Sequence, residues 1–261
     1  MDKPLGQKID VRNLSFSYGD QQVLKDISLS FNKGKFYSII GPNGSGKSTF
    51  IKNISKLITP KAGSVLIDNQ DICKMKNKEL AKMMAVIPQN ILIDYDFTVF
   101  DIVMMGRSPY KRSFQDFNGE DQAIVEKYMR ATNTWNLKDQ LITNLSGGEI
   151  QRVIAARALS QEADIILLDE ITSHLDIQYQ IEFLNIFRSL KEDKIIIAVL
   201  HDLNLASTFS DEIILLKRGQ VEAKGSPEEV ISKENIKKVY NLSVEIFENP
   251  VSQCPYVIPI V

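Results

Sequence analysis

The sequence predicts an α/β fold in which a helix-rich lobe is inserted into a mainly parallel sheet. In the second half of the chain, short apolar runs of strand length alternate with helix-forming segments, a pattern typical of parallel sheets. Between about residues 90 and 160 that alternation stops, and apolar residues recur at helical spacing instead. We therefore expect a single domain over residues 1–261, with a core from about 1–89 and 161–261 and a helical subdomain at about 90–160.

The N-terminal part of the chain is predicted to form strands that lead to a glycine-rich turn. Apolar and polar residues alternate over 27–31, which predicts a half-buried strand after an earlier strand at about 11–16. The continuous apolar run 36–40 predicts a buried strand, followed by the turn and by a helix through about residue 57.

The remaining elements follow from apolar spacing. Thr98 suits a helix N-cap, because its hydroxyl can accept a bond from a backbone N–H of the first turn, and Val99, Ile102 and Val103 then share one helix face. Further helices are predicted at residues 78–84, 120–132 and 147–159. Further strands are predicted at residues 65–67, 86–87, 165–168, 195–200 and 213–216.

The composition excludes several classes of protein. A net charge of −2 and a sequence pI near 5.8 provide no attraction for nucleic acid, so we expect no nucleic-acid partner. Two cysteines, Cys73 and Cys254, cannot form a disulfide framework and are typical of a cytosolic protein. The N-terminus lacks the apolar core of a signal peptide, and apolar runs such as 195–200 are far shorter than the ~18 residues of a spanning helix. We expect any membrane association to come through a partner.

A glycine-rich segment between a predicted strand and a predicted helix fits the P-loop pattern. Its glycines let backbone N–H groups surround phosphate oxygens, and the following helix directs its positive N-terminus at them. We expect Lys47 to neutralise the β- and γ-phosphates of ATP and Ser48 to ligate Mg²⁺. The residues predicted to contact the nucleotide here are Gly41, Pro42, Asn43, Gly44, Ser45, Gly46, Lys47, Ser48 and Thr49.

Two carboxylates, Asp169 and Glu170, follow the predicted buried strand 165–168. Ligands of open α/β sheets bind at the carboxyl ends of strands, so both are candidates for the nucleotide site. We expect Asp169 to hold Mg²⁺ through its water shell and Glu170 to orient and deprotonate the attacking water, a contribution of roughly 10²–10⁴ in rate. The pair alone is weak evidence, and the P-loop upstream strengthens it.

A second anion-binding segment is Leu145-Ser-Gly-Gly-Glu149. Ser146, Gly147 and Gly148 open a predicted helix, whose N-terminus can bind an anion. A nucleotide already surrounded by a P-loop leaves no room for another cradle from the same surface. The second cradle therefore implies a second, opposing surface.

With these motifs in this order, the sequence resembles the ATP-binding cassette ATPase family over essentially its whole length. The resemblance implies a RecA-like core, an N-terminal antiparallel β subdomain and an inserted α-helical subdomain. Tyr18 resembles the aromatic residue that stacks on adenine, Gln89 the catalytic residue that reaches the metal and water, and His201 the switch histidine that contacts the γ-phosphate. Asp176, at the end of Ser173-His-Leu-Asp, resembles part of the loop that crosses the dimer interface.

The resemblance also implies a head-to-tail homodimer with two ATP molecules at its interface. Lys47 of one subunit and Ser146 of the other would face the same γ-phosphate. Gly147, Gly148 and Asp176 of that other subunit would also contact this nucleotide in trans. ATP binding would close the pair and hydrolysis would release it. One departure from the family pattern is Ile171, which stands where proline usually follows the catalytic glutamate. This puts the placement of the loop through Asp176 in doubt.

Subfamily features point to an importer. The segment after residue 220 is too short for the regulatory domain that sugar-importer ATPases append, and no membrane segment is fused to the cassette. We therefore expect two copies of a separate permease and, indirectly, a substrate-binding protein, with the chain on the cytoplasmic face of the cell membrane. Segments 98–103, 106–110 and 225–230 are similar to those of ATPases that serve iron-siderophore, haem and cobalamin importers.

Other interpretations stay open. Within the family, the alternative is the ATPase of a zinc, manganese or molybdate importer. A soluble cassette ATPase of ribosomes or DNA repair normally carries two cassettes or a long coiled-coil insertion, whereas this chain has one P-loop and one LSGGE segment. A P-loop kinase has no use for LSGGE. The sequence does not name the ligand, because selectivity resides in the permease and the binding protein.

Overall fold

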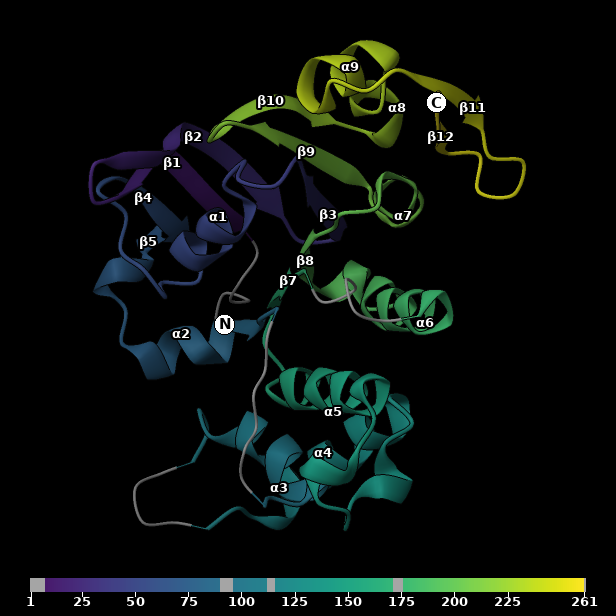
Figure 1. Cartoon of the computed structure of the whole chain (residues 1–261). Helices are drawn as coiled ribbons and strands as arrows, with labels where there is room; N and C mark the ends of the chain where they lie inside the picture. Colours follow the sequence, from purple (N-terminus) through teal and green to yellow (C-terminus); the bar gives the residue numbers. More distant parts are fainter. Residues whose placement is uncertain (1–7, 90–95, 112–115, 171–175, 261) are drawn as a thin grey trace.

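The computed structural model describes residues 8–89, 96–111, 116–170 and 176–260. Ile171 and the first three residues of Ser173-His-Leu-Asp176 lie outside these ranges, so the expected effect of Ile171 stays a prediction. Sheets occupy the upper part of the view in Figure 1, and helices from the middle of the chain form a separate layer below them.

The larger sheet confirms the predicted parallel α/β core. Its strands, in the order in which they lie side by side, are β10 (Gln220–Gly225), β9 (Glu212–Lys217), β3 (Lys35–Ile40), β8 (Ile195–Val199), β7 (Ile165–Asp169) and β6 (Met84–Ile87). Strands β9 to β6 are parallel, and β10 is antiparallel to β9. Strands β7 and β8 are buried at every residue, because a parallel sheet is covered on both faces.

A smaller antiparallel sheet confirms the N-terminal β subdomain. Its strands, in spatial order, are β2 (Gln21–Asn32), β1 (Lys8–Tyr18), β4 (Ala62–Ile67) and β5 (Gln70–Asp71). Phe31 of β2 packs edge-on against Tyr37 of β3, with ring centroids 4.9 Å apart, and lies 6.3 Å from the ring of Phe50. These contacts join the small sheet to the larger one.

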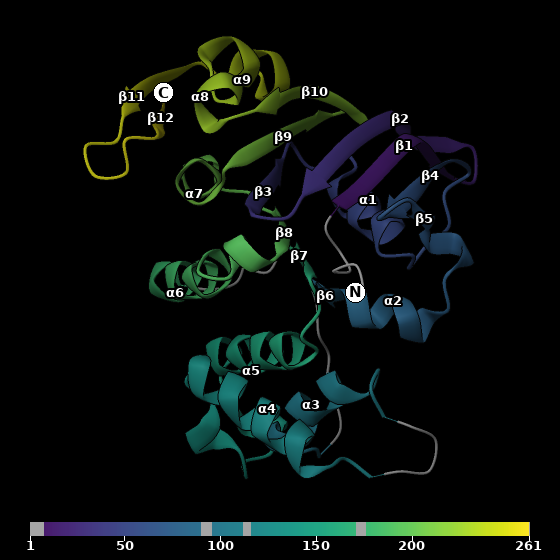
Figure 2. The same ribbon diagram turned by 180° about the vertical axis from the view of Figure 1, so that it is seen from behind.

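The helices are α1 (Lys47–Ile54), α2 (Asn77–Met83), α3 (Val99–Met104), α4 (Gly119–Ala131), α5 (Gly147–Ser160), α6 (Ile177–Arg188), α7 (Leu203–Phe209), α8 (Pro227–Val230) and α9 (Lys233–Tyr240). Short 3-10 turns lie at Ile72–Lys74, Met105–Arg107, Trp135–Leu137, Ile142–Asn144 and Lys191–Asp193. Helices α3, α4 and α5 pack on one another and form the lower layer in Figures 1 and 2. The predicted cap of α3 is confirmed, since Oγ1 of Thr98 accepts a bond of 3.1 Å from the N–H of Asp101.

Two parts of the chain differ from the sequence prediction. Helix α1 ends at Ile54 and not near residue 57, because Lys56 has a left-handed φ of +60° that ends the helix. The C-terminal hairpin of β11 (Val244–Glu248) and β12 (Pro255–Pro259) had no clear signal, since its strands are short and β12 has a proline at each end. In Figures 1 and 2, β12 lies between β11 and α7.

Candidate nucleotide site

The P-loop connects β3 to α1 and opens onto a cavity of about 470 Å³. It leaves the carboxyl end of a central parallel strand, which is where ligands bind in open α/β sheets. The cavity is lined by Asn43, Gly44, Gly46, Lys47, Ser48 and Thr49, by Glu170 after β7, and by Gln21 and Val23 of β2. Sequence reasoning missed Gln21 and Val23, because a strand residue without a motif carries no signal of what it will face.

Packing around the P-loop requires glycine at two positions. Gly46 has a φ of +105°, and a Cβ atom there would lie 2.8 Å from Cδ2 of Leu24. Gly41 has a φ of +150°, and a Cβ atom there would overlap the carbonyl oxygen of Leu216 on β9. A larger residue at either position would strain the backbone and displace its neighbours. Strands β2 and β9 therefore help to shape the loop.

Lys47 is a buried cation at the start of α1. Its side chain donates hydrogen bonds of 2.9 Å to the carbonyl oxygen of Gly41 and 3.2 Å to that of Pro42, and only 4% of its surface is exposed. Burial lowers the pKa of Lys47, and the nearby carboxylates of Glu170 and Asp169 partly offset this shift. Since these bonded partners are neutral carbonyls, the ammonium group can still attract an anion in the cavity.

Glu170 is the point at which four separate segments meet. Its carboxylate accepts a bond of 2.7 Å from the amide of Gln89, lies 3.1 Å from Nε2 of His201, and is 3.4 Å from the hydroxyl of Ser48. Its backbone has a φ of +53°, a left-handed conformation that costs a non-glycine residue on the order of 1–3 kcal/mol. Such strain is typical of functional positions, where surrounding contacts hold the residue in place.

Asp169 ends β7 and has one buried oxygen that lacks a partner. Its Oδ1 has no hydrogen-bond partner within the described residues, and 6% of the residue is exposed. Burial raises the pKa of Asp169, while the hydroxyl of Ser48 and the charges of Lys52 and Lys47 act in the opposite direction. A buried carboxylate oxygen beside a hydroxyl is a suitable donor set for a hard cation such as Mg²⁺. No cluster of three His, Cys, Asp or Glu side chains suited to a metal occurs in the described part of the chain.

The structure does not bring the remaining predicted residues to this cavity. Ser146 is exposed and caps α5 by exchanging bonds with Glu149, whose pKa the Ser146 hydroxyl lowers. Gly147 and Gly148 begin α5, and Asp176 directly precedes α6. Helices α1 and α5 lie well apart in both Figures 1 and 2. Within one copy, the second cradle is therefore not part of the P-loop site.

Tyr18 also lies outside the set of residues that line the cavity. It ends β1, is 48% exposed, and packs edge-on against Phe16 with ring centroids 4.9 Å apart. The exposed ring remains available for stacking.

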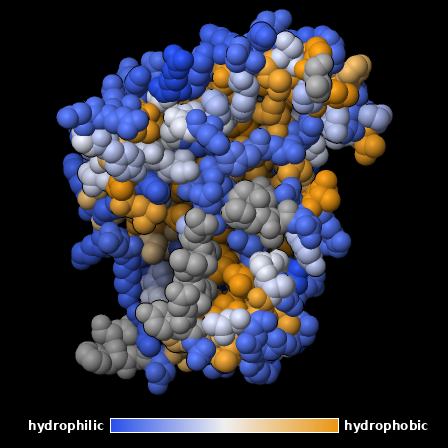
Figure 3. Space-filling view, in the orientation of Figure 1, coloured by the Kyte–Doolittle hydropathy of each residue, from blue (hydrophilic) through white to orange (hydrophobic). Residues whose placement is uncertain are grey.

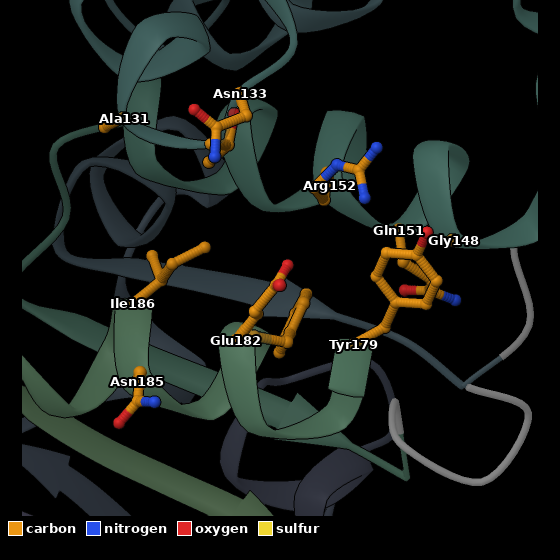
Figure 4. Close-up of a pocket in the computed structure, with 11 residues that line it drawn as sticks. Ala131, Asn133, Gly148, Gln151, Arg152, Tyr179, Glu182, Asn185 and Ile186 are labelled. Carbon is orange, nitrogen blue, oxygen red and sulfur yellow. The ribbon is translucent and has the colours of Figure 1, made fainter. Parts of the chain in front are cut away.

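A second cavity, of about 360 Å³, lies between α5 and α6. Figure 4 shows Gly148 and Arg152 on α5 facing Tyr179 on α6, and the guanidinium of Arg152 is 5.3 Å from the centre of the Tyr179 ring. The segments that carry Ser146 and Asp176 are therefore the starts of two neighbouring helices.

Comparison with known proteins identifies the family. The family model described as ABC transporter matches residues 24–173. The ferric enterobactin transport ATP-binding protein FepC of Escherichia coli is 39% identical over 249 residues, which cover 95% of this chain and 92% of that protein. The chain belongs to the ABC transporter family.

Further comparisons agree with this family. The petrobactin import ATP-binding protein FpuD of Bacillus anthracis is 36% identical to this ABC protein over 253 residues, or 96% of this chain and 93% of that protein. A solved dimeric structure of a bacterial ABC transporter cassette is 30% identical, with a TM-score of 0.73 over 84% of this chain and 98% of that chain. The chain is thus an ATP-binding ABC transporter ATPase with the cassette fold. Across the described ranges, no helix combines the length and apolar character needed to cross a bilayer.

Proposed function

We propose that this chain binds and hydrolyses MgATP at a head-to-tail dimer interface and so drives import of an iron chelate, haem or cobalamin through a separate permease. The single observation that carries the chemical part is the convergence of Ser48, Gln89 and His201 on the Glu170 carboxylate. A carboxylate tied to the P-loop helix and to two polar side chains is suited to organise a water molecule next to a phosphate.

The P-loop residues would bind the nucleotide. The backbone of residues 41–49 surrounds phosphate oxygens in this proposal, and Lys47 supplies a buried positive charge beside them. Ser48, Gln89 and Asp169 would hold Mg²⁺, which is consistent with the unpartnered Oδ1 of Asp169. Bound Mg²⁺ would neutralise charge that develops on the β- and γ-phosphates.

Glu170 would be the general base. Its carboxylate orients the attacking water and accepts its proton, while Gln89 holds the carboxylate in place from the end of β6. His201 lies on the opposite side, after β8, and would contact the γ-phosphate. Tyr18 would stack on the adenine ring, for which its exposed side chain is available.

The dimer follows from the residues that stay away from the cavity. Ser146 and Gly147 are exposed at the start of α5, Gly148 is partly buried beside them, and Asp176 precedes the adjacent helix. A second copy related by a two-fold axis would place this cradle opposite the P-loop, which the dimeric state of the solved cassette supports. The homodimer would dock on two copies of a permease at the cytoplasmic face of the membrane. A substrate-binding protein would deliver the transported ligand to that permease.

The proposed transport class rests on relatives that match almost the full chain. FepC is named for ferric enterobactin transport and FpuD for petrobactin import, and these names are the basis for proposing an iron chelate here. A zinc, manganese or molybdate importer is the alternative. Uptake of labelled ferric siderophore, haem, cobalamin and zinc should be compared in cells with the parent chain and with Glu170→Gln at equal expression. Loss of zinc uptake alone would favour the alternative.

A further inference from the structure

Two side chains of α7 make hydrogen bonds to the backbone of β12, where a neighbouring strand would otherwise pair. The amide of Asn204 accepts a hydrogen bond of 2.7 Å from the N–H of Val257 and donates one of 3.3 Å to the carbonyl oxygen of the same residue. Ser207, about one turn further along α7, donates a bond of 2.6 Å to the carbonyl oxygen of Pro255. These bonds connect one side of a seven-residue helix to one edge of β12.

The backbone of β12 explains why the single amide of Asn204 can satisfy the hydrogen-bonding groups on its outer edge. In an antiparallel pair, alternate residues direct both backbone groups away from the partner strand. The backbone bond from Ile260 to Ser243 lies inside the hairpin, so Pro255, Val257 and Pro259, which have the opposite parity, turn outward. The two prolines carry no N–H. Val257 is therefore the outward residue of β12 with both a donor and an acceptor, and the amide on α7 satisfies both.

The hairpin and α7 depend on each other. Figure 3 shows apolar side chains at the upper right, where Figure 1 places the hairpin, and Phe247 is 55% exposed. An isolated two-stranded hairpin is marginally stable in water. Contacts of β12 with α7 and of β11 with α9 therefore both stabilise the hairpin, and the contacts with α7 restrict where that helix can lie.

The first turn of α7, which carries Asn204, also adjoins the proposed hydrolysis site. Oδ1 of Asp202 caps the helix by accepting bonds of 2.7 Å and 2.9 Å from the N–H groups of Asn204 and Leu205. His201 directly precedes this cap and carries the imidazole that lies 3.1 Å from Glu170. Asn204 thus belongs both to the capped first turn and to the contact with the hairpin.

We propose that Asn204 is a positioning residue for ATP hydrolysis. Through Val257 it fastens the first turn of α7 to the C-terminal hairpin, and this fixes the backbone from which His201 reaches Glu170. The inference rests on the role proposed above for His201. The hairpin thus stabilises the position of His201, although the hairpin itself lies outside the P-loop.

Asn204→Ala in the full chain tests the proposal, with turnover and ATP affinity measured separately. We expect kcat to fall about fivefold to tenfold, because two hydrogen bonds that orient the helix are lost, while the Kd for ATP stays unchanged. The matched control is Asn235→Ala. Asn235 also donates an amide bond in the C-terminal region, 2.9 Å to the carbonyl oxygen of Val230, and should leave kcat at the parent value.

A double-mutant comparison separates positioning from general destabilisation. In a His201→Ala background, Asn204→Ala should cause no further loss of residual turnover, because the group that it positions is absent. Equal losses in both backgrounds, or a folded Asn204→Ala variant with parental kcat, would overturn the proposal. If His201→Ala alone leaves turnover intact, the proposed role of His201 fails. The ring-proton NMR resonance of His201 then decides, since the chain has two histidines: a shift in Asn204→Ala supports positioning, and an unchanged resonance contradicts it.

Discussion

The side-chain amide of Gln89 donates a hydrogen bond of 2.7 Å to Oε2 of Glu170. Gln89 follows β6 and Glu170 follows the adjacent strand β7, so the bond joins two neighbouring strand ends. The two residues are 81 positions apart in the sequence, and the bond holds the Glu170 side chain from the end of the neighbouring strand.

Glu170→Gln should abolish most turnover without abolishing ATP binding. Glutamine keeps the shape of the side chain but cannot accept the proton of the attacking water, so we expect a loss of roughly 10²–10⁴ in kcat. The nucleotide-bound dimer should accumulate, as measured by gel filtration with MgATP. Glu248→Gln, an exposed glutamate on β11, is the control and should behave like the parent. Near-normal hydrolysis by Glu170→Gln would exclude this residue as the base.

Lys47→Ala should weaken ATP binding itself. The substitution removes a buried positive charge and its bonds to Gly41 and Pro42, and we expect the Kd for ATP to rise by about tenfold or more, which corresponds to ~1.4 kcal/mol. Calorimetry measures this directly. Lys74→Ala removes an exposed lysine outside the cavity and should have no effect on the Kd. Equal affinities for Lys47→Ala and the parent would refute the assignment.

Asp169→Asn should stabilise the fold while it weakens the response to Mg²⁺. Burial raises the pKa of Asp169 in the folded state, so folding becomes less favourable as the pH rises through that pKa. Asparagine carries no charge, and at pH 7 the variant should unfold at a higher temperature than the parent, by roughly 2–4 °C per kcal/mol. The difference should shrink as the pH is lowered toward the range in which Asp169 is protonated. A lower unfolding temperature at pH 7 would show that the charged form is stabilised.

Mixing two inactive variants tests whether the Ser146 cradle acts in trans. A heterodimer of Lys47→Ala with Ser146→Arg has one site that carries both lesions and one site that carries neither, whereas each homodimer has two damaged sites. The mixture should therefore recover part of the ATPase activity of the parent, if one intact site can turn over. If both sites must hydrolyse ATP together, the mixture stays inactive. Crosslinking then decides, because a crosslink between Ser146 and the P-loop of the other copy would support action in trans.

A further result would contradict the dimer independently of the variants. If the parent hydrolyses ATP at a specific activity that does not change with protein concentration, while light scattering with MgATP shows only monomers, no site can depend on a second copy. In that case Ser146→Arg should also leave the activity unchanged.

Some elements could be predicted because local signals and tertiary packing agree. The run Ile165–Leu168 is apolar throughout and becomes a fully buried strand, and Thr98 caps α3 as its side chain predicts. Strand β12 could not be predicted, because its short, proline-bounded sequence favours no element by itself. Its edge is satisfied by Asn204, which lies 53 residues away in the sequence.

The sequence by itself determined the P-loop, because its chemistry depends on consecutive residues in one turn: glycines with unusual φ angles, then Lys47 and Ser48 at a helix start. It also placed Asp169 and Glu170 at the end of a buried strand. Only the tertiary structure decided which side chains meet there. Ser48 and Gln89 precede Glu170 by 122 and 81 residues. They reach it because burial of apolar strands sets β3, β8, β7 and β6 side by side, with Ser48 on the helix that follows β3 and Gln89 just after β6. Spacing along the chain does not predict that strand order, because the order arises from long-range packing.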